Sequence, residues 1–348
     1  MAGTGIVEAV ILTGLKKVSQ NIIELTVSKS KEVALNKYKK VTGPRKLKKF
    51  ADNCNLYLYS RTLYSTQQNI HIDDYYVPLT ISPTNDVNHI IEVDELKFSS
   101  PGITNIIGKA GQGKSTILKR LFRNELLSGN TFPVFFELKN FDSSPLISQL
   151  VRWFKSKNLN VDETIIKFLL KENKITIFLD AFDEINPELH DKAVQEIETF
   201  NISYKKTPIV ITTRPDTQII NQLCVNNYQL NDIDKKQIRA IFENICGDDI
   251  ERVEAAIAEL DKNQKIYEVI TTPILAVLLF LTYKVWTEIP SSLTSFYERI
   301  FNTLLRWHDS IKSGKKIVRI TLPINDNQIE EVFERLCYKS MSKNINDF

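Results

Sequence analysis

Residues 103–116 have the sequence ITNIIGKAGQGKST, in which a short apolar run leads into a glycine-rich segment. The run Ile103–Ile107 is rich in β-branched residues and predicts a buried strand, and Ile117–Leu121 begins the apolar spacing of a helix. The segment between them fits the pattern GxxxxGK[ST], whose backbone N–H groups surround phosphate oxygens at a helix N-terminus. The sequence therefore predicts a phosphate-binding turn between a strand and a helix.

The residue types in this turn each have a chemical reason. Glycines let the backbone turn its N–H groups inward. We expect Lys114 to reach the β- and γ-phosphates, Ser115 to ligate Mg²⁺ through its hydroxyl, and Thr116 to donate to the α-phosphate. The candidate phosphate-binding residues are Gly108, Lys109, Ala110, Gly111, Gln112, Gly113, Lys114, Ser115 and Thr116.

A second apolar run, residues 176–180, ends in acidic residues. Ligands of parallel sheets sit beyond the carboxyl ends of the strands, so Asp180 is predicted to lie near the phosphate-binding turn and to hold Mg²⁺ together with Ser115. Asp183 and Glu184 follow one short turn later. One of them, Glu184 in preference, is expected to orient or deprotonate the water that attacks a phosphate.

A third run, residues 209–213, ends at Arg214. We expect this guanidinium to lie close to the γ-phosphate, where it would distinguish ATP from ADP. The alternative is an ordinary surface arginine paired with Asp216. The chain has no Asn-Lys-x-Asp element of the kind that reads guanine in Ras-like GTPases, which favours an adenine nucleotide.

Strand-like and helical stretches alternate through the middle of the chain, and this order predicts a doubly wound α/β fold. The expected strands are 103–107, 132–138, 175–179 and 209–213, and the expected helices are 115–127, 145–157, 163–171 and 191–205. Residues 231 to about 312 have a helical pattern, followed by a strand-like run at 317–322 and one more helix.

The N-terminal region has a helical pattern over residues 5–40 and again over about 45–70, and residues 73–101 form a proline-containing extended connector. The first 50 residues hold eleven Lys or Arg and three Glu, a net charge of +8, which leaves −5 for the other 298 because the whole chain carries +3. This basic cluster indicates either a solvated helical face or an arm for nucleic acid or anionic lipid. The near-neutral total argues against nucleic-acid binding by the chain as a whole.

Three interpretations of residues 1–70 stay open. The region could be a helical bundle packed on the central domain, or an effector or oligomerisation module. It could also contact a membrane through Ile6–Leu15 and the lysines that follow, which is the less favoured interpretation.

The remaining composition excludes several classes of protein. Four scattered cysteines, without a CxxC pair, and four dispersed histidines predict neither a disulfide framework nor a zinc site. The longest uncharged apolar run, Val269–Tyr283, is too short to cross a bilayer and contains Pro273. The N-terminus lacks the basic start of a signal peptide, so we expect a cytoplasmic protein.

Several of these motifs, in order, resemble the NACHT domain, a branch of the STAND class of AAA-like P-loop ATPases. The matching stretches are residues 108–116, 132–139, 179–184 and 212–216, followed by 272–279, which resembles the family's proline-bearing lid helix, and 289–298, which resembles the entry to its winged helix. The resemblance covers roughly residues 75–320. One departure is Ala181, where the family often has glycine.

The resemblance implies an α/β fold of the AAA-like P-loop NTPase type, with a parallel sheet, an N-terminal helical domain and a C-terminal helical lid and winged-helix region. The expected boundaries are 1–72 for the N-terminal helical domain, 73–101 for the connector, 102–228 for the nucleotide-binding domain, 229–288 for the lid and 289–348 for the winged-helix-like region. Pro273 of the lid is expected to close on the adenine, with Val77 and Pro78, next to Tyr76, on the other side. No repeat-type sensor follows, so we expect either a short sensor or a chain that continues.

The resemblance also implies a regulated switch with ATP or ADP and Mg²⁺ as cofactors and slow hydrolysis. Family members rest as ADP-bound monomers, and a trigger lets ATP enter and the protein oligomerise. Relatives act in innate immunity, including bacterial defence against phage, so the expected partners are further copies of this chain and an unknown trigger that phage could supply. Two alternatives stay open: a conventional motor or remodelling ATPase with fast turnover, acting on protein or nucleic acid, and a scaffold that holds nucleotide only for stability.

Overall fold

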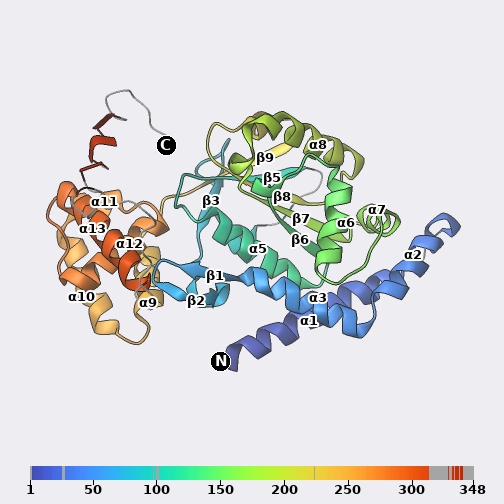
Figure 1. Cartoon of the computed structure of the whole chain (residues 1–348), viewed down its shortest axis with the longest axis horizontal. Helices are drawn as coiled ribbons and strands as arrows, with labels where there is room; N and C mark the ends of the chain where they lie inside the picture. The colour runs from blue at the N-terminus through green and yellow to red at the C-terminus, as the bar shows by residue number, and fades with distance from the viewer. Residues whose placement is uncertain are drawn as a thin grey trace.

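The computed structural model describes residues 2–25, 28–96, 98, 102–222 and 224–312, with residues 328, 331–332, 334–336 and 338–339 near the C-terminus. Figure 1 shows a central sheet with helices around it, the N-terminal helices against one end and a separate group of C-terminal helices beyond the other.

A seven-stranded sheet forms the centre of the described part of the chain. Its strands, in spatial order, are β4 (Ile91–Glu92), β3 (Thr80–Pro83), β9 (Val225–Leu230), β5 (Ile103–Ile107), β8 (Ile209–Thr213), β7 (Ile175–Asp180) and β6 (Phe132–Glu137). The strands from β9 to β6 are parallel, while β3 and β4 run antiparallel to their neighbours. Every residue of β5, β7 and β8 is buried, which is why apolar residues predominate in their sequences. The predicted α/β fold and its four predicted strands are confirmed.

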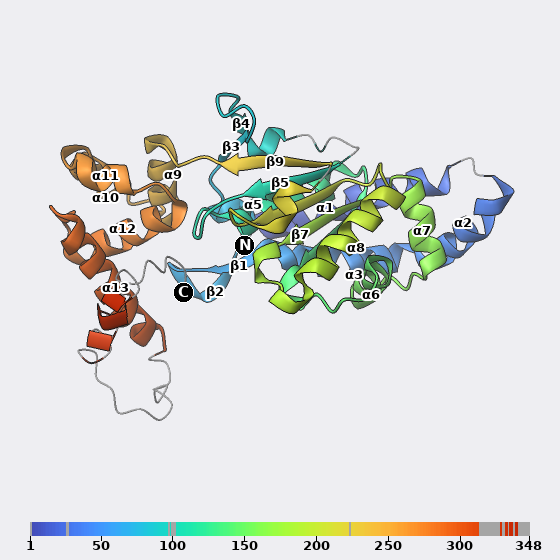
Figure 2. The same ribbon diagram turned by 90° about the horizontal axis from the view of Figure 1, so that it is seen from above.

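Helices follow the parallel strands and pack against the sheet (Figure 2). They are α5 (Lys114–Ser128), α6 (Leu146–Ser156), α7 (Glu163–Lys171) and α8 (His190–Ser203). Short 3₁₀ turns are η1 (Leu56–Leu58), η2 (Val93–Glu95), η3 (Leu138–Asn140), η4 (Phe182–Glu184), η5 (Pro187–Leu189) and η6 (Gln218–Asn221). The four helices predicted in this region are confirmed to within a few residues.

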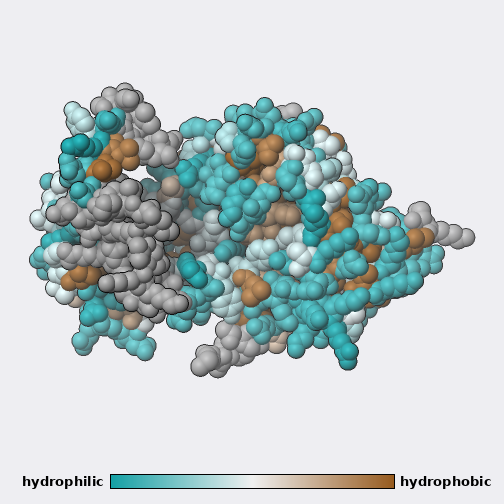
Figure 3. Space-filling view, in the orientation of Figure 1, coloured by the Kyte–Doolittle hydropathy of each residue, from teal (hydrophilic) through white to brown (hydrophobic). Residues whose placement is uncertain are grey.

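The N-terminal region packs on the central domain. Its helices are α1 (Ala2–Ile23), α2 (Lys29–Val41) and α3 (Pro44–Asn55), so the helical pattern predicted over 5–40 is confirmed and consists of two helices. Helix α1 crosses α5 so closely that a Cβ at Gly14 would overlap the carbonyl oxygen of Leu126. Ile11 and Leu15, which belong to the stretch of the membrane interpretation, are completely buried, and so is Val18. The apolar stripe of α1 is therefore used inside the protein, and the surface over α1–α3 is mostly hydrophilic (Figure 3).

The prediction of a helix over about 45–70 is wrong beyond Asn55, where α3 ends. A β-hairpin of β1 (Tyr59–Thr62) and β2 (Ser65–His71), followed by the short helix α4 (Ile72–Tyr75), occupies the second half. Leu56, Leu58 and Leu63 fall by chance near helical spacing, but the segment between them is rich in Tyr, Ser and Thr, which suit a strand. The hairpin lies between the sheet and the C-terminal helices (Figure 2). The expected N-terminal helical domain is thus partly β.

Three strands of the central sheet were also missed from the sequence. β3 and β4 lie in the expected connector, and β9 crosses the expected boundary at residue 228. β9 was hidden because its sequence, VNNYQL, is polar for an internal strand. The side-chain amide of Asn105 on β5 donates to the side-chain oxygen of Asn227 on β9 at 2.8 Å, so the two polar groups satisfy each other inside the sheet.

The C-terminal part is helical, as predicted, with α9 (Lys235–Cys246), α10 (Ile250–Lys262), α11 (Gln264–Val269), α12 (Pro273–Trp286) and α13 (Leu293–Lys312). We call α9–α12 the lid. The strand-like run 317–322 and most of the expected winged-helix region lie outside the described residues. Among the helices that the structure describes, none combines the length and the apolar character needed to cross a membrane.

Candidate functional site

The predicted phosphate-binding turn, hereafter the phosphate loop, joins β5 to α5 as expected. Gly111 and Gly113 have φ angles of +74° and +91°, which favour glycine, and Gly113 is the N-cap of α5. The sheet places this loop centrally, because β5 has β9 on one side and β8 on the other. The 15-residue helix α5 then directs its N-terminus at the loop, which favours negative charge there.

Side chains of the loop brace its own backbone. The Lys114 ammonium donates to the carbonyl oxygens of Gly108 and Lys109, at 2.7 and 3.2 Å. The Gln112 side chain, almost fully buried, accepts the backbone N–H of Lys109 at 2.6 Å. Burial lowers the pKa of Lys114, and the nearby Asp183 carboxylate acts in the opposite direction. These contacts hold the loop in a cradle shape with a cation at its centre.

Asp180, at the end of β7, is positioned by the strand beside it. Its carboxylate accepts a hydrogen bond from the Thr212 hydroxyl on β8 at 2.7 Å, and that hydroxyl accepts the backbone N–H of Ala181 at 2.8 Å. Thr212 is fully buried, and Asp180 is 7% exposed. Thr212 is therefore a positioning residue that the sequence analysis missed, because its role appears only once β8 is known to neighbour β7.

Ala181 itself has a left-handed conformation, with φ +56° and ψ +64°. This is the position where the sequence departs from the family's glycine. The left-handed region is unfavourable for residues with a Cβ, so the turn from β7 into the acidic residues carries local strain. The hydrogen bond from its N–H to Thr212 holds it in place.

Arg214, at the end of β8, forms an ion pair with Asp183, with 2.8 Å between Nε and Oδ2. Its ion-pair partner is therefore Asp183 and not Asp216, which was the alternative suggested by the sequence. The Asp183 side chain is 12% exposed, and its Oδ1 is buried without a hydrogen-bond partner among the described residues. Glu184, the preferred candidate for water activation, is exposed and has no ion pair in the part of the chain that the structure describes. The charged groups that lie close enough to act on Lys114 are those of Asp180, Asp183, Glu184 and Arg214.

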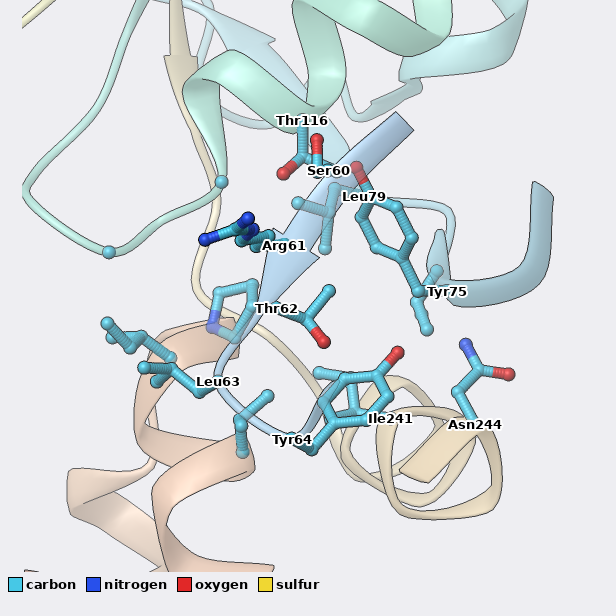
Figure 4. A pocket seen from close by; sticks show the side chains of 16 residues that line it. Ser60, Arg61, Thr62, Leu63, Tyr64, Tyr75, Leu79, Thr116, Ile241 and Asn244 are labelled. Atoms are coloured by element: carbon cyan, nitrogen blue, oxygen red, sulfur yellow. The ribbon is translucent and has the colours of Figure 1, made fainter. Parts of the chain in front are cut away.

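A cavity of about 350 Å³ lies next to the loop, and Figure 4 shows it. Val77 and Pro273, two of the expected adenine contacts, line it, whereas Tyr76 and Pro78 are not among its lining residues. Instead, the Arg120 guanidinium lies over the Tyr76 ring, and the Pro78 carbonyl accepts a hydrogen bond from the Gln237 side chain of the lid. One wall of the cavity comes from the hairpin β1–β2, which was not predicted from the sequence.

The lid begins directly on the phosphate loop. The backbone N–H of Ile274 donates to the Gly111 carbonyl at 3.3 Å, and a Cβ at Gly111 would overlap the Ile274 side chain. Thr272 caps the first turn of α12, with Pro273 in that turn, so the N-terminus of α12 is firmly defined beside the cavity. The loop and the lid thus touch with no space between them.

The donor set fits Mg²⁺. In the described part of the chain, no group of three or more His, Cys, Asp or Glu residues could hold a metal by itself. Mg²⁺ commonly takes only one or two carboxylates and keeps water or phosphate oxygens as its other ligands. The Asp180 carboxylate and the Ser115 hydroxyl beside a phosphate cradle match that preference.

Residues 103–249 match the family model of the NACHT domain. No curated protein matches the chain. Among solved structures, the chain is similar to a STAND protein (signal transduction ATPase with numerous domains) with a tetratricopeptide repeat sensor from Pyrococcus horikoshii, with 17% identity, 58% of this chain and 30% of that chain covered and a TM-score of 0.36. It is also similar to PCH-2 from C. elegans (12% identity, 59% and 60% covered, TM-score 0.32) and to Cdc6p from Pyrobaculum aerophilum (15% identity, 55% and 58% covered, TM-score 0.32).

The chain therefore spans less than two thirds of the length of each of these three proteins. The matched segment starts at the first residue of β5 and contains the phosphate loop, Asp180 and Arg214. Residues 103–249 of this chain thus match the NACHT family model, and they hold the phosphate loop on a parallel α/β sheet.

Proposed function

We propose that this chain is a nucleotide-controlled switch that binds ATP or ADP with Mg²⁺, hydrolyses ATP slowly and oligomerises when ATP replaces ADP. The observation that carries the proposal is the contact between the lid and the phosphate loop, where Ile274 packs on Gly111. Because the same loop would hold the phosphates, a change of nucleotide is felt at the lid without any intermediate element. A switch needs such a differential contact.

Each residue of the site has a task in this proposal. The loop N–H groups and Lys114 bind the β- and γ-phosphates, and Thr116 donates to the α-phosphate. Ser115 and Asp180 would hold Mg²⁺, which neutralises charge on the phosphates when bound. Thr212 fixes the Asp180 carboxylate through its 2.7 Å hydrogen bond. The apolar part of the cavity, with Val77 and Pro273, receives the base.

Water activation falls to Glu184 or Asp183. Asp183 is engaged by Arg214, whereas Glu184 is exposed. An exposed carboxylate is poorly oriented, and a carboxylate in an ion pair is a weaker base, so either candidate agrees with slow hydrolysis. Arg214 would exchange Asp183 for the γ-phosphate when ATP is bound, since its guanidinium suits phosphate oxygens.

Oligomerisation would carry the N-terminal helices with the NACHT domain. The ion pairs Lys31–Glu172, at 2.5 Å, and Lys37–Asp162, at 2.7 Å, tie α2 to α7. By its resemblance to the family, we propose a role in defence signalling, including defence against phage, with an activating partner that the family's sensors would recognise. The protein would act in the cytoplasm.

The nucleotide that stays on the purified protein, together with its turnover, tests this function. Tightly retained ADP with little turnover supports the switch. Rapid turnover that DNA or a protein stimulates would favour a motor or remodelling ATPase. Retained nucleotide with no change of assembly on exchange of ADP for ATP would favour a scaffold.

A further inference from the structure

The hairpin β1–β2 forms one wall of the cavity beside the phosphate loop. Five consecutive residues of the hairpin, 60–64, line the cavity, and Gly111, Gly113 and Thr116 line it from the loop and the first turn of α5. The lid closes the remaining side with Ile241, Asn244, Pro273, Ile274 and Val277. The hairpin is continuous in sequence with α3, so a part of the N-terminal region reaches into the nucleotide site.

A hydrogen bond fixes the hairpin to the phosphate-binding helix. The Lys119 ammonium donates to the Ser60 hydroxyl at 2.7 Å. Lys119 lies three residues after Thr116 on α5, and residues three apart share one face of a helix. Ser60 is therefore held next to the first turn of α5, which is the turn that receives phosphate oxygens.

The next residue, Arg61, is turned out of regular pairing. Ser60 pairs with Ile70 and Thr62 with Ser65, and the register shifts between them, at Arg61. Irregularities of this kind redirect a side chain and are common next to active sites. Figure 4 shows the Arg61 side chain pointing toward the ribbon of the phosphate loop, with Asn244 at the opposite end of the cavity.

Arg61 forms no ion pair with another residue that the structure describes. Among the described residues that line the cavity, it is the one with a charged side chain, and no carboxylate lies among them. The arginines on the outer side of α5 differ in this respect: Arg120 pairs with Asp73 and Asp94, and Arg123 pairs with Asp73. A cavity with one arginine and no acid suits an anionic ligand, and a guanidinium suits phosphate oxygens in particular.

We propose that Arg61 binds an α- or β-phosphate oxygen of the nucleotide. This inference rests on the proposed function, because it takes the cavity as the site of a nucleoside diphosphate or triphosphate. It gives the N-terminal region a direct contact with the nucleotide, independent of the lid. The contact between the hairpin and the central domain would then change when nucleotide binds or dissociates.

Calorimetric titration of ADP, AMP and adenosine into the full chain tests the proposal. Arg61→Ala should weaken ADP binding about tenfold, the loss expected for a charge-assisted hydrogen bond, and leave adenosine within about twofold. Arg61→Lys keeps the positive charge and should lower ADP affinity less than Arg61→Ala does. Arg45→Ala, at an exposed position of α3 outside the cavity, is the control and should bind all three ligands as the wild type does.

Two results would overturn the proposal. ADP affinity in Arg61→Ala equal to that in Arg45→Ala would mean that Arg61 contacts no phosphate. Equal losses for ADP and adenosine would mean that Arg61 contacts the base or only supports the hairpin. Lys114→Ala separates this inference from the proposed function. If ADP binding is lost in Lys114→Ala and unchanged in Arg61→Ala, only the inference fails. If ADP binding is unchanged in both variants, the cavity is not a nucleotide site, and the inference and the proposed function both fail.

Discussion

The guanidinium of Arg214 and the carboxylate of Asp183 form an ion pair, 2.8 Å apart, that joins the end of β8 to the acidic turn after β7. Asp183 is largely buried in this pair, whereas half of the Arg214 side chain is exposed. Arg214 can therefore leave Asp183 for a ligand at the surface of the sheet edge, and the pair couples the ends of β7 and β8.

Arg214→Ala should remove the difference in assembly between ADP and an ATP analogue. Its effect on ADP affinity should stay within about threefold, because a half-exposed pair contributes only ~0–1 kcal/mol. Light scattering with each nucleotide measures the assembly. Lys139→Ala is the matched control, since Lys139 pairs with Glu137 at the same sheet edge and is equally exposed. Unaltered discrimination in Arg214→Ala would remove the sensing role.

Gly111→Ala should separate the lid from the phosphate loop. Its Cβ would overlap Ile274, and Gly111 has a φ of +74° that disfavours other residues. We expect ADP to bind at least about tenfold more weakly, the loss that follows when ~1.4 kcal/mol of contact is given up. Gly43→Ala is the control, because nothing lies within 4 Å of a Cβ there. Wild-type ADP affinity in Gly111→Ala would show that the lid contact does not matter for binding.

Ala181→Gly should stabilise the protein by roughly 0.5–1 kcal/mol, because the relief of a left-handed alanine exceeds the added entropy of glycine in the unfolded chain. The φ of +56° at Ala181 is the reason for the expected sign. Chemical denaturation measures the change. Ala193→Gly, in the buried interior of α8, should instead destabilise by ~1 kcal/mol. Destabilisation by both substitutions would contradict the strain at Ala181.

Lys114 should make ADP binding depend on pH in the alkaline range. Burial lowers its pKa in the free protein, and the phosphates of bound ADP favour the ammonium and raise that pKa again. Binding therefore takes up a proton between the two pKa values, and affinity falls as pH rises through the lower one. Calorimetry in two buffers of different ionisation heat measures the uptake. Proton release, or normal ADP binding by Lys114→Ala, would contradict the assignment.

Glu184→Ala should lower ATP turnover by roughly 10²–10⁴-fold if Glu184 activates the water, and it should spare ADP binding because Glu184 is exposed. Asp183→Ala should lower turnover as well, and it also releases Arg214. Steady-state phosphate release measures both. Glu188→Ala, four residues further along and exposed, is the control. Unchanged turnover in both variants would place water activation elsewhere.

The parallel core of the fold could be predicted from the sequence for a physical reason. Strands buried on both faces are mostly apolar, so β5, β7 and β8 stand out without any tertiary information. The phosphate loop stands out as well, because the local backbone geometry determines its glycines and Lys114. β9 could not be found in this way, since Asn226 is exposed and the Asn227 side chain is paired with the amide of Asn105.

The hairpin wall of the cavity could not be predicted from the sequence for another reason. Arg61 and Ser60 face the loop because Lys119, 59 residues away from Ser60, donates to the Ser60 hydroxyl. Sequence proximity likewise suggested Asp216 as the alternative partner of Arg214, whereas the turn after the adjacent strand supplies Asp183. Contacts between strands and between the hairpin and α5 depend on topology, which residue spacing alone does not contain.

The measurement that tests the switch most directly is the mass of the purified full chain in solution with ADP and Mg²⁺, and again with a slowly hydrolysed ATP analogue and Mg²⁺. We expect a monomer with ADP and a larger assembly with the analogue, and we expect Lys114→Ala to remain a monomer with both. The same mass for the wild type with both nucleotides would contradict the proposed switch.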